Sequence, residues 1–139
     1  MVDHDVLARK IASATARLRE VAEIVAQPRD DFLEDPKARD LAAFYTLLAV
    51  QDCIDLASHW VADEGWQPPD HAGSTFDILA DRGVVTHELA TVLRQAVGLR
   101  NVIAHGYAAL DAGRFYEEIR RAGPDIEQFL AELAEAAGL

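Results

Sequence analysis

Cysteine is almost absent from this sequence, because Cys53 is the one cysteine among 139 residues. A single cysteine excludes an internal disulfide framework and a cysteine-based zinc site. Long apolar runs are missing too, since none approaches the roughly 20 residues that span a bilayer. The first residues, Met1 to Asp5, show no basic segment followed by an apolar stretch. We therefore expect no membrane association and no secretory signal, and we predict a cytoplasmic location.

Basic residues are scarce: 13 Lys and Arg stand against 24 Asp and Glu, a net charge of −11 at pH 7. This charge argues against indiscriminate binding to DNA, RNA or an anionic membrane. The dinucleotide pattern Gly-x-Gly and the P-loop pattern Gly-Lys-Ser/Thr are absent. His87-Glu88 begins like a zinc-protease motif, but Thr91 stands where that motif needs its second histidine. We expect no cofactor.

Residues that favour helices are abundant instead, and apolar positions recur at steps of three and four. We expect a first helix over about 4–26 and a second from the Asp35-Pro36 N-cap to about 63. A third runs from the capping box Ser74-x-x-Asp77 to Gly83, and a fourth from Thr86 to Gly106. A fifth runs from Asp111 to Ala122, and the Gly123-Pro124 break separates it from a last helix to about 136. The fold prediction is an all-α antiparallel bundle of four to five helices in one domain over residues 1–139.

Four polar residues crowd the end of the helix that precedes Gly106. Arg100 and Asn101 interrupt an apolar run, and His105 and Tyr107 follow. In a structural interpretation, His105 favours the negative end of the helix dipole, Gly106 terminates the helix in a left-handed conformation, and Arg100 pairs with a carboxylate. In a functional interpretation, the arginine binds phosphate oxygens while the histidine accepts or donates a proton.

The spacing limits how these groups can meet. Five positions rotate a helix by about 140°, so Arg100 and His105 do not share a face of a regular helix. They can converge if the last turn loosens before Gly106, or if two copies of the segment meet across a dimer. Either arrangement puts a permanent cation beside a group that titrates near neutrality.

A second polar group lies in the preceding long helix, where Asp52, Asp55 and His59 follow the spacing i, i+3, i+7. These residues form either the solvated face of an amphipathic helix or a polar stripe toward Arg100 and His105, where a carboxylate could orient the arginine. Asp55 and His59 lack a convincing third ligand, so we predict no metal site.

Arg100-Asn101-x-x-x-His105-x-Tyr107 resembles the Arg-x4-His-x-Tyr signature of the HepT-like toxins, a branch of the HEPN superfamily. The resemblance extends along nearly the whole chain. It includes Asp31-Phe32-Leu33-x-Asp35, Ala49-x-x-x-Cys53-Ile54-Asp55-Leu56-Ala57-x-His59, Phe76-x-x-Leu79-x-x-x-Gly83-Val84 and Val97 to His105, followed by Leu110-Asp111.

The resemblance implies an all-α, HEPN-like bundle that forms a homodimer, with the two signatures lining a cleft at the interface. It implies a toxin of a toxin–antitoxin pair that cuts RNA, not DNA, without a metal. It also implies an antitoxin partner, a minimal nucleotidyltransferase that adds AMP to the signature tyrosine. Carried onto this chain, Arg100 and His105 are catalytic, Tyr107 is the modification acceptor, and Asp55 has the position of a polar residue near the cleft. Asn101 adds a neutral amide that could support the site as well. Gly106 departs from the many relatives that carry a side chain there, which can loosen the turn before Tyr107.

Two other classes of function remain open at this stage. The chain could be a non-catalytic helical binding module that docks a nucleotidyltransferase or a nucleotide, with Arg100 as a phosphate clamp. Its acidic surface would steer a basic partner toward it. It could also be a structural bundle in which Arg100 and His105 only pack and cap.

Overall fold

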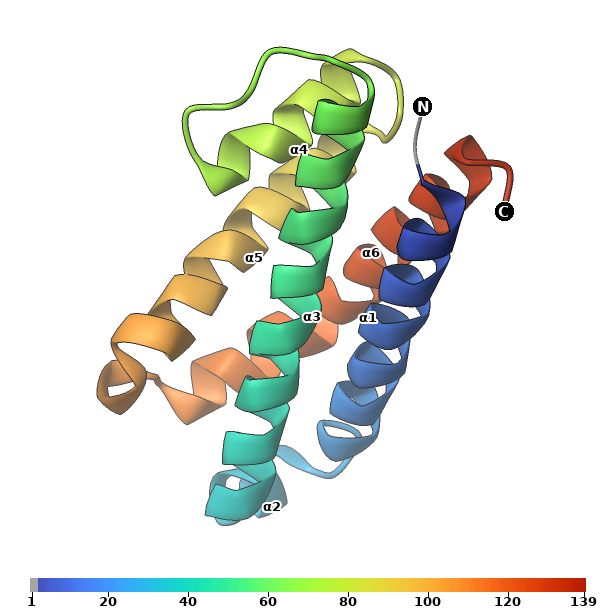
Figure 1. Ribbon diagram of the computed structural model, residues 1–139. Helices are drawn as coiled ribbons and strands as arrows, with labels where there is room; N and C mark the ends of the chain where they lie inside the picture. Colours follow the sequence, from blue (N-terminus) through green and yellow to red (C-terminus); the bar gives the residue numbers. More distant parts are fainter. Residues whose placement is uncertain (1–2) are drawn as a thin grey trace.

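The computed structural model describes residues 3–139, and this range is helical without a strand (Figure 1). The elements are α1 (His4–Ile24), α2 (Arg29–Leu33), α3 (Pro36–Asp63), α4 (Ala72–Asp81), α5 (His87–His105), the 3-10 turn η1 (Tyr107–Ala109) and α6 (Ala112–Ala136). The prediction of an all-α bundle is confirmed. Six α-helices replace the expected four to five in this range.

The long helix α3 lies at the centre of the bundle. It contacts α1 along one side and α4 and α5 along the other, while α6 packs against α1 and α5 (Figure 1). Eleven of the 28 residues of α3 are buried, and the small or apolar Ala49, Val50, Cys53, Leu56 and Ala57 are each fully enclosed. Its central place means that a side chain on α3 can reach either α1 or α5.

Helix starts follow the predicted capping residues in two places. The Asp35 side chain accepts a hydrogen bond from the Ala38 amide, with Pro36 at the first helical position. Thr86 accepts one from the Leu89 amide at the start of α5. At the start of α4, however, the prediction that Ser74 forms the cap is wrong. His71 is the capping residue, because its ring accepts a hydrogen bond from the Ser74 amide, and the helix begins earlier, at Ala72.

The predicted break at Gly123-Pro124 is wrong as well, because α6 runs through both residues. Proline removes one helical hydrogen bond, and glycine weakens a helix by about 0.5–1 kcal/mol. The side chains buried before and after Gly123-Pro124 lie on one apolar face of α6, and their packing against the core offsets this cost. They are Phe115, Tyr116, Ile119, Ile126, Phe129, Leu130 and Leu133. Burial of each contributes about 1.5–3 kcal/mol, so packing keeps the helix continuous.

Length and composition alone would allow α3 to cross a membrane, and it is the one helix of residues 3–139 that passes this test. Half of its most apolar segment is buried inside the bundle. Such burial is the property of a core helix.

Candidate functional site

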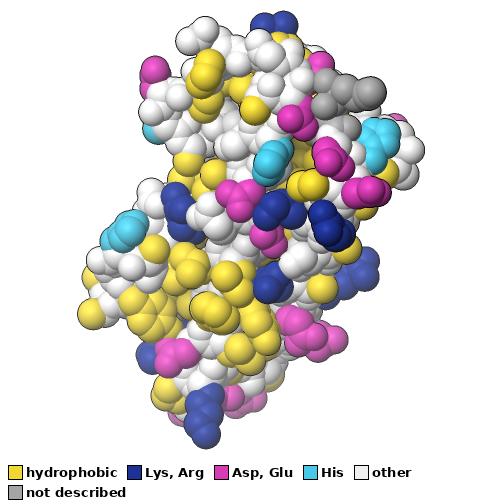
Figure 2. Space-filling model, in the orientation of Figure 1, with side chains coloured by type: hydrophobic (Ala, Val, Ile, Leu, Met, Phe, Trp, Pro, Cys, Tyr) yellow, Lys and Arg dark blue, Asp and Glu magenta, His cyan; other side chains and the backbone are white. Residues whose placement is uncertain are grey.

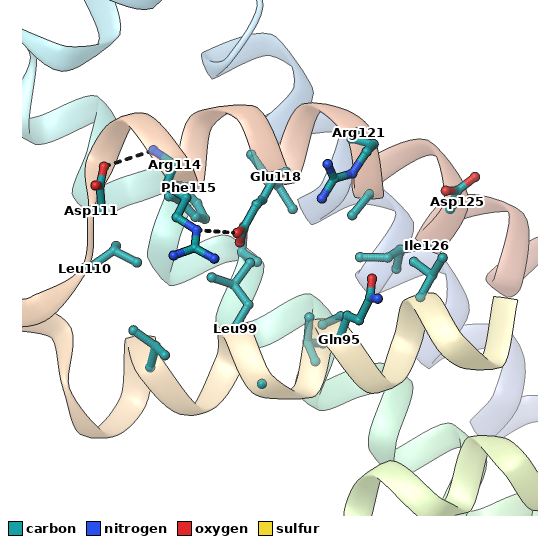
Figure 3. Close-up of a pocket in the computed structure, with 18 of the residues that line it drawn as sticks. Gln95, Leu99, Leu110, Asp111, Arg114, Phe115, Glu118, Arg121, Asp125 and Ile126 are labelled. Carbon is teal, nitrogen blue, oxygen red and sulfur yellow. Dashed lines mark hydrogen bonds and ion pairs between the residues drawn. The ribbon is translucent and has the colours of Figure 1, made fainter. Parts of the chain in front are cut away.

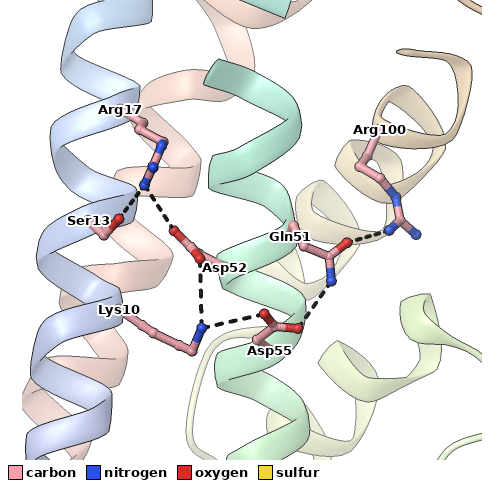
Figure 4. Close-up of polar contacts among 7 residues, drawn as sticks. All are labelled: Lys10, Ser13, Arg17, Gln51, Asp52, Asp55 and Arg100. Carbon is pink, nitrogen blue, oxygen red and sulfur yellow. Dashed lines mark hydrogen bonds and ion pairs between the residues drawn. The ribbon is translucent and has the colours of Figure 1, made fainter. Parts of the chain in front are cut away.

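Arg100 projects from α5 toward α3, where it meets Gln51 (Figure 4). Its Nη1 donates to the Gln51 Oε1 at 2.6 Å, and the Gln51 Nε2 donates to the Asp55 Oδ1 at 3.1 Å. Within the described range, the Arg100 Nε is buried without a hydrogen-bond partner. The guanidinium is therefore held in place by a neutral amide, and Asp55 acts on it only through that amide.

Gln51 is a residue that the sequence analysis missed. It belongs to no motif, and 49 positions separate it from Arg100 in the chain. The one signal available was its position one helical turn before Asp55, on the same face of α3.

Asp52 and Asp55 also join α3 to α1 (Figure 4). The Lys10 Nζ lies 3.9 Å from a carboxylate oxygen of Asp52 and 3.5 Å from one of Asp55, and the Arg17 Nη1 lies 3.6 Å from Asp52. Burial raises the pKa of Asp52, and the two cations oppose that shift. Asp52 thus serves the α1–α3 contact, whereas Asp55 faces both this contact and the Gln51–Arg100 pair.

His105 is the last residue of α5 and is exposed. With Asn101, Val102, Gly106 and Ala109, it lines a shallow depression. The helix keeps its form to its end, where the Gly106 amide donates to the Val102 carbonyl at 2.9 Å. The last turn is therefore not loosened, and the rotation of about 140° between Arg100 and His105 persists. His59 is exposed and lines a separate pocket near the start of α1.

Gly106 has φ −146°, so it is not the left-handed helix terminator that the structural interpretation assumed. A Cβ added there would lie 3.7 Å from the Val102 carbonyl oxygen, an ordinary contact. The departure from relatives with a side chain at this position therefore requires no different backbone before Tyr107.

Tyr107 begins η1 and turns back toward the start of α3. Its hydroxyl donates to the Asp40 Oδ1, and the Arg39 Nε donates to the same oxygen at 3.1 Å. These two hydrogen bonds hold the pKa of the Asp40 carboxyl below its usual value. Burial, and then the hydrogen bond to Asp40, raise the pKa of the Tyr107 phenol. Tyr107 is thus a half-buried phenol aimed at a carboxylate.

A larger cavity of about 760 Å³ lies between α5 and α6 (Figure 3). Leu99, Phe115 and Ile126 form part of its apolar wall, and an ion pair of 3.1 Å between Arg114 and Glu118 lies on its α6 side. The cavity shares Val102 and Ala109 with the depression at His105. Arg100, His105 and Tyr107 are not among its lining residues in the part of the chain described.

Exposed apolar side chains gather over the N-terminal half of α3 (Figure 2). Leu41 and Phe44 are 43% and 52% exposed, and Val102 of α5 is 42% exposed. Leu41, Phe44 and the half-buried Leu48 follow the spacing i, i+3, i+7, so they form one stripe along α3 that leads toward Gln51. We call this the α3 apolar stripe. Contiguous exposed apolar surface of this kind is typical of an interaction face.

Metal ligands do not converge anywhere in residues 3–139, where no group of three or more His, Cys, Asp or Glu is placed to hold an ion.

The chain is thus an all-α bundle with Arg100 and His105 in the last turns of α5 and Tyr107 in the turn that follows, a fold class shared with HEPN toxins of known structure. Within that class, the family model described as "Ribonuclease HepT-like" matches residues 11–133. The chain belongs to the HepT-like family.

Relatives in sequence and in structure agree with this assignment. The chain is 24% identical over 127 residues to the mRNA nuclease HepT of Shewanella oneidensis, covering 91% of this chain and 95% of that protein. A solved structure of the tri-AMPylated HEPN toxin of Shewanella oneidensis in complex with MNT antitoxin has a TM-score of 0.87 at 23% identity, covering 96% and 99% of the two chains. A cytosolic protein of unknown function from Bacillus subtilis, YutE, has a TM-score of 0.82 at 16% identity, covering 96% and 90%. The HEPN-like fold is thereby confirmed.

Proposed function

We propose that this protein is a metal-independent endoribonuclease, the toxin of a toxin–antitoxin pair, in which Arg100 and His105 cut RNA. The observation that carries the proposal is the placement of Arg100, held by the neutral Gln51 amide so that its positive charge is not cancelled. Membership of a ribonuclease family, and similarity to a protein named as an mRNA nuclease, support the choice of RNA. We expect action on RNA rather than DNA, in the cytoplasm, by one domain over residues 1–139.

The active unit is a homodimer in this proposal. Because α5 stays regular to its end, Arg100 and His105 of one copy diverge, and a second copy is needed to complete the site. The α3 apolar stripe supplies an exposed surface for that contact. Two α5 ends would then bring two arginines and two histidines to one cleft, with Asn101 beside each His105.

The reaction follows from these groups. His105 takes the proton from an RNA 2′-hydroxyl, whose oxygen attacks the adjacent phosphorus. The bond from phosphorus to the 5′-oxygen breaks and leaves a 2′,3′-cyclic phosphate, while His105 of the partner subunit protonates the departing oxygen. Arg100 stabilises the negative charge that develops on the phosphorane. General acid–base catalysis contributes about 10²–10⁴-fold.

Inhibition by an antitoxin completes the proposal. A minimal nucleotidyltransferase transfers AMP to the hydroxyl of Tyr107, as the solved structure of a related toxin named as tri-AMPylated and bound to MNT antitoxin suggests. The added nucleotide brings bulk and a fixed negative charge to the end of α5, where RNA phosphate should bind.

RNA cleavage by the purified, unmodified protein in EDTA tests this proposal. The intact mass is measured first, since an attached AMP would mask activity. We expect the wild type to cut single-stranded RNA and His105→Ala to lose about 10²-fold or more of that rate. Wild-type-like cleavage by His105→Ala would exclude the mechanism.

The alternative function is a non-catalytic module that docks a nucleotidyltransferase or a nucleotide. The net charge of −11 favours it, since acidic surface attracts a basic partner rather than RNA. Absence of RNA cleavage by a verified unmodified dimer would support this alternative.

A further inference from the structure

The environment of the Tyr107 hydroxyl is more specific than a modification site alone requires. In the HepT-like proposal this hydroxyl is only an acceptor, but here it donates its proton to the Asp40 carboxylate, 67 positions away in the chain. The Arg39 Nε holds the same carboxylate oxygen at 3.1 Å. Three side chains from two elements therefore fix the direction of one phenolic proton.

The geometry points to Asp40 as the proton acceptor in the nucleotidylation of Tyr107, a catalytic group that the toxin itself contributes to its own inactivation. This inference rests on the proposed function, because it deepens the modification step. The Tyr107 oxygen attacks the α-phosphorus of a nucleoside triphosphate held by the nucleotidyltransferase. The bond from that phosphorus to the β-phosphate oxygen breaks, pyrophosphate leaves, and the phenolic proton passes to the Asp40 Oδ1 and then to water.

A carboxylate suits this task although it is a much weaker base than a phenolate. The pKa of Asp40 lies below its usual value and that of Tyr107 above, so at neutral pH the pair is a carboxylate and an intact phenol. The phenol becomes far more acidic as its oxygen bonds to phosphorus, and the proton then moves to the base already in place. Protein kinases use an aspartate in the same way toward a substrate hydroxyl.

The Tyr107–Asp40 pair is also accessible to a nucleotide from solvent. The Asp40 side chain is 56% exposed and that of Arg39 is 36% exposed, so a bulky nucleotide can approach the tyrosine oxygen from solvent. Arg39 is the other charged group that shifts the pKa of Tyr107, and it does so in the opposite direction to Asp40. After transfer, the new phosphodiester carries a negative charge next to Asp40, so repulsion and the loss of the hydrogen bond free the modified side chain from α3.

The experiment compares the wild type with Asp40→Asn, Asp40→Ala, Tyr107→Phe and the control Asp31→Asn. Asp31 is an exposed carboxylate of α2, so its change removes the same charge while the hydrogen bond from Tyr107 to Asp40 is kept. Each protein is mixed with a minimal nucleotidyltransferase, ATP and Mg²⁺, and the mass increase is followed over time. We expect Asp40→Asn to slow modification by about 10²-fold, Tyr107→Phe to abolish it, and Asp31→Asn to leave it unchanged.

The pH dependence separates a base from a residue that only holds the ring. Without Asp40 the phenol must ionise before it attacks, so the ratio of wild-type to Asp40→Asn rates should fall by about tenfold for each pH unit between pH 6 and 8. A ratio that does not change with pH, or a faster Asp40→Asn, contradicts the inference and leaves the modification itself intact. Failure of the wild type to be modified overturns the antitoxin part of the proposed function, and this inference with it.

NMR titration of the tyrosine rings tests the hydrogen bond between Tyr107 and Asp40 without any nucleotidyltransferase. Asp40→Ala should lower the pKa of Tyr107 toward its ordinary value, because the neighbouring carboxylate is gone. An unchanged pKa would mean that the hydrogen bond does not exist in solution, and the inference would be wrong.

Discussion

At the scale of single residues, the chemistry of the site depends on what holds Arg100. A carboxylate in the place of Gln51 would bind the guanidinium more strongly but would cancel its charge. A neutral amide orients the arginine and leaves the positive charge for a phosphate. Within residues 3–139 the buried Arg100 Nε has no hydrogen-bond partner, so no second acceptor offsets the positive charge at that atom.

Gln51→Glu tests this role of the amide. We expect RNA cleavage to fall by about tenfold or more, because the new carboxylate competes with RNA phosphate for Arg100. The salt dependence of RNA binding should also weaken by about one phosphate contact. Both quantities come from kcat/KM and binding measured over a range of KCl concentrations. Gln128→Glu, which adds the same charge to an exposed part of α6, should behave as the wild type; equal effects from both variants would exclude a specific role for Gln51.

The sequence indicated Arg100, His105 and Tyr107 because they are close together in an apolar run. It could not indicate Gln51 or Asp40, which belong to no motif and meet Arg100 and Tyr107 only after the chain has folded back. The candidate residues of the signature were thus visible in the sequence, whereas their partners on α3 were not.

At the scale of elements, packing against the core keeps α6 continuous although Gly123-Pro124 predicted a helix break. Gly123 lies inside the helix, and a Cβ added there would meet no atom within 4 Å. Gly83, by contrast, has φ +75° after the end of α4, a conformation that side chains disfavour.

These two glycines give a matched prediction. Gly123→Ala should raise the free energy of unfolding by about 0.5–1 kcal/mol, because alanine loses less conformational freedom in a helix. Gly83→Ala should lower it by about 1 kcal/mol or more, since alanine is strained at positive φ. Urea denaturation followed by circular dichroism measures both. A loss of stability in Gly123→Ala would show that the helix is bent or broken there in solution.

At the scale of the whole molecule, the proposed homodimer accounts for two features, the exposed apolar side chains of α3 and the divergence of Arg100 from His105. A second copy would cover the α3 apolar stripe and complete the site. Activity and oligomeric state should therefore be lost together.

Phe44→Arg tests this coupling, since it puts a charge in the middle of the α3 apolar stripe. We expect a folded monomer by light scattering and a loss of RNA cleavage of about 10²-fold, because each site would lack its second histidine. Leu139→Arg is the control, as Leu139 is equally exposed, at 53%, and lies at the end of the chain. A monomeric Phe44→Arg that still cleaves RNA would show that one copy holds a complete site.

Local patterns were enough to specify the helical class, most helix ends and the three residues of the signature, because periodicity, capping and short spacing act between neighbours in the chain. The continuity of α6, the cap of α4 by His71, and the partners of Arg100 and Tyr107 depended on the folded chain. Each of these features is a contact between distant segments, or a balance between local cost and core burial, and the energy of such contacts exists only once the helices pack together.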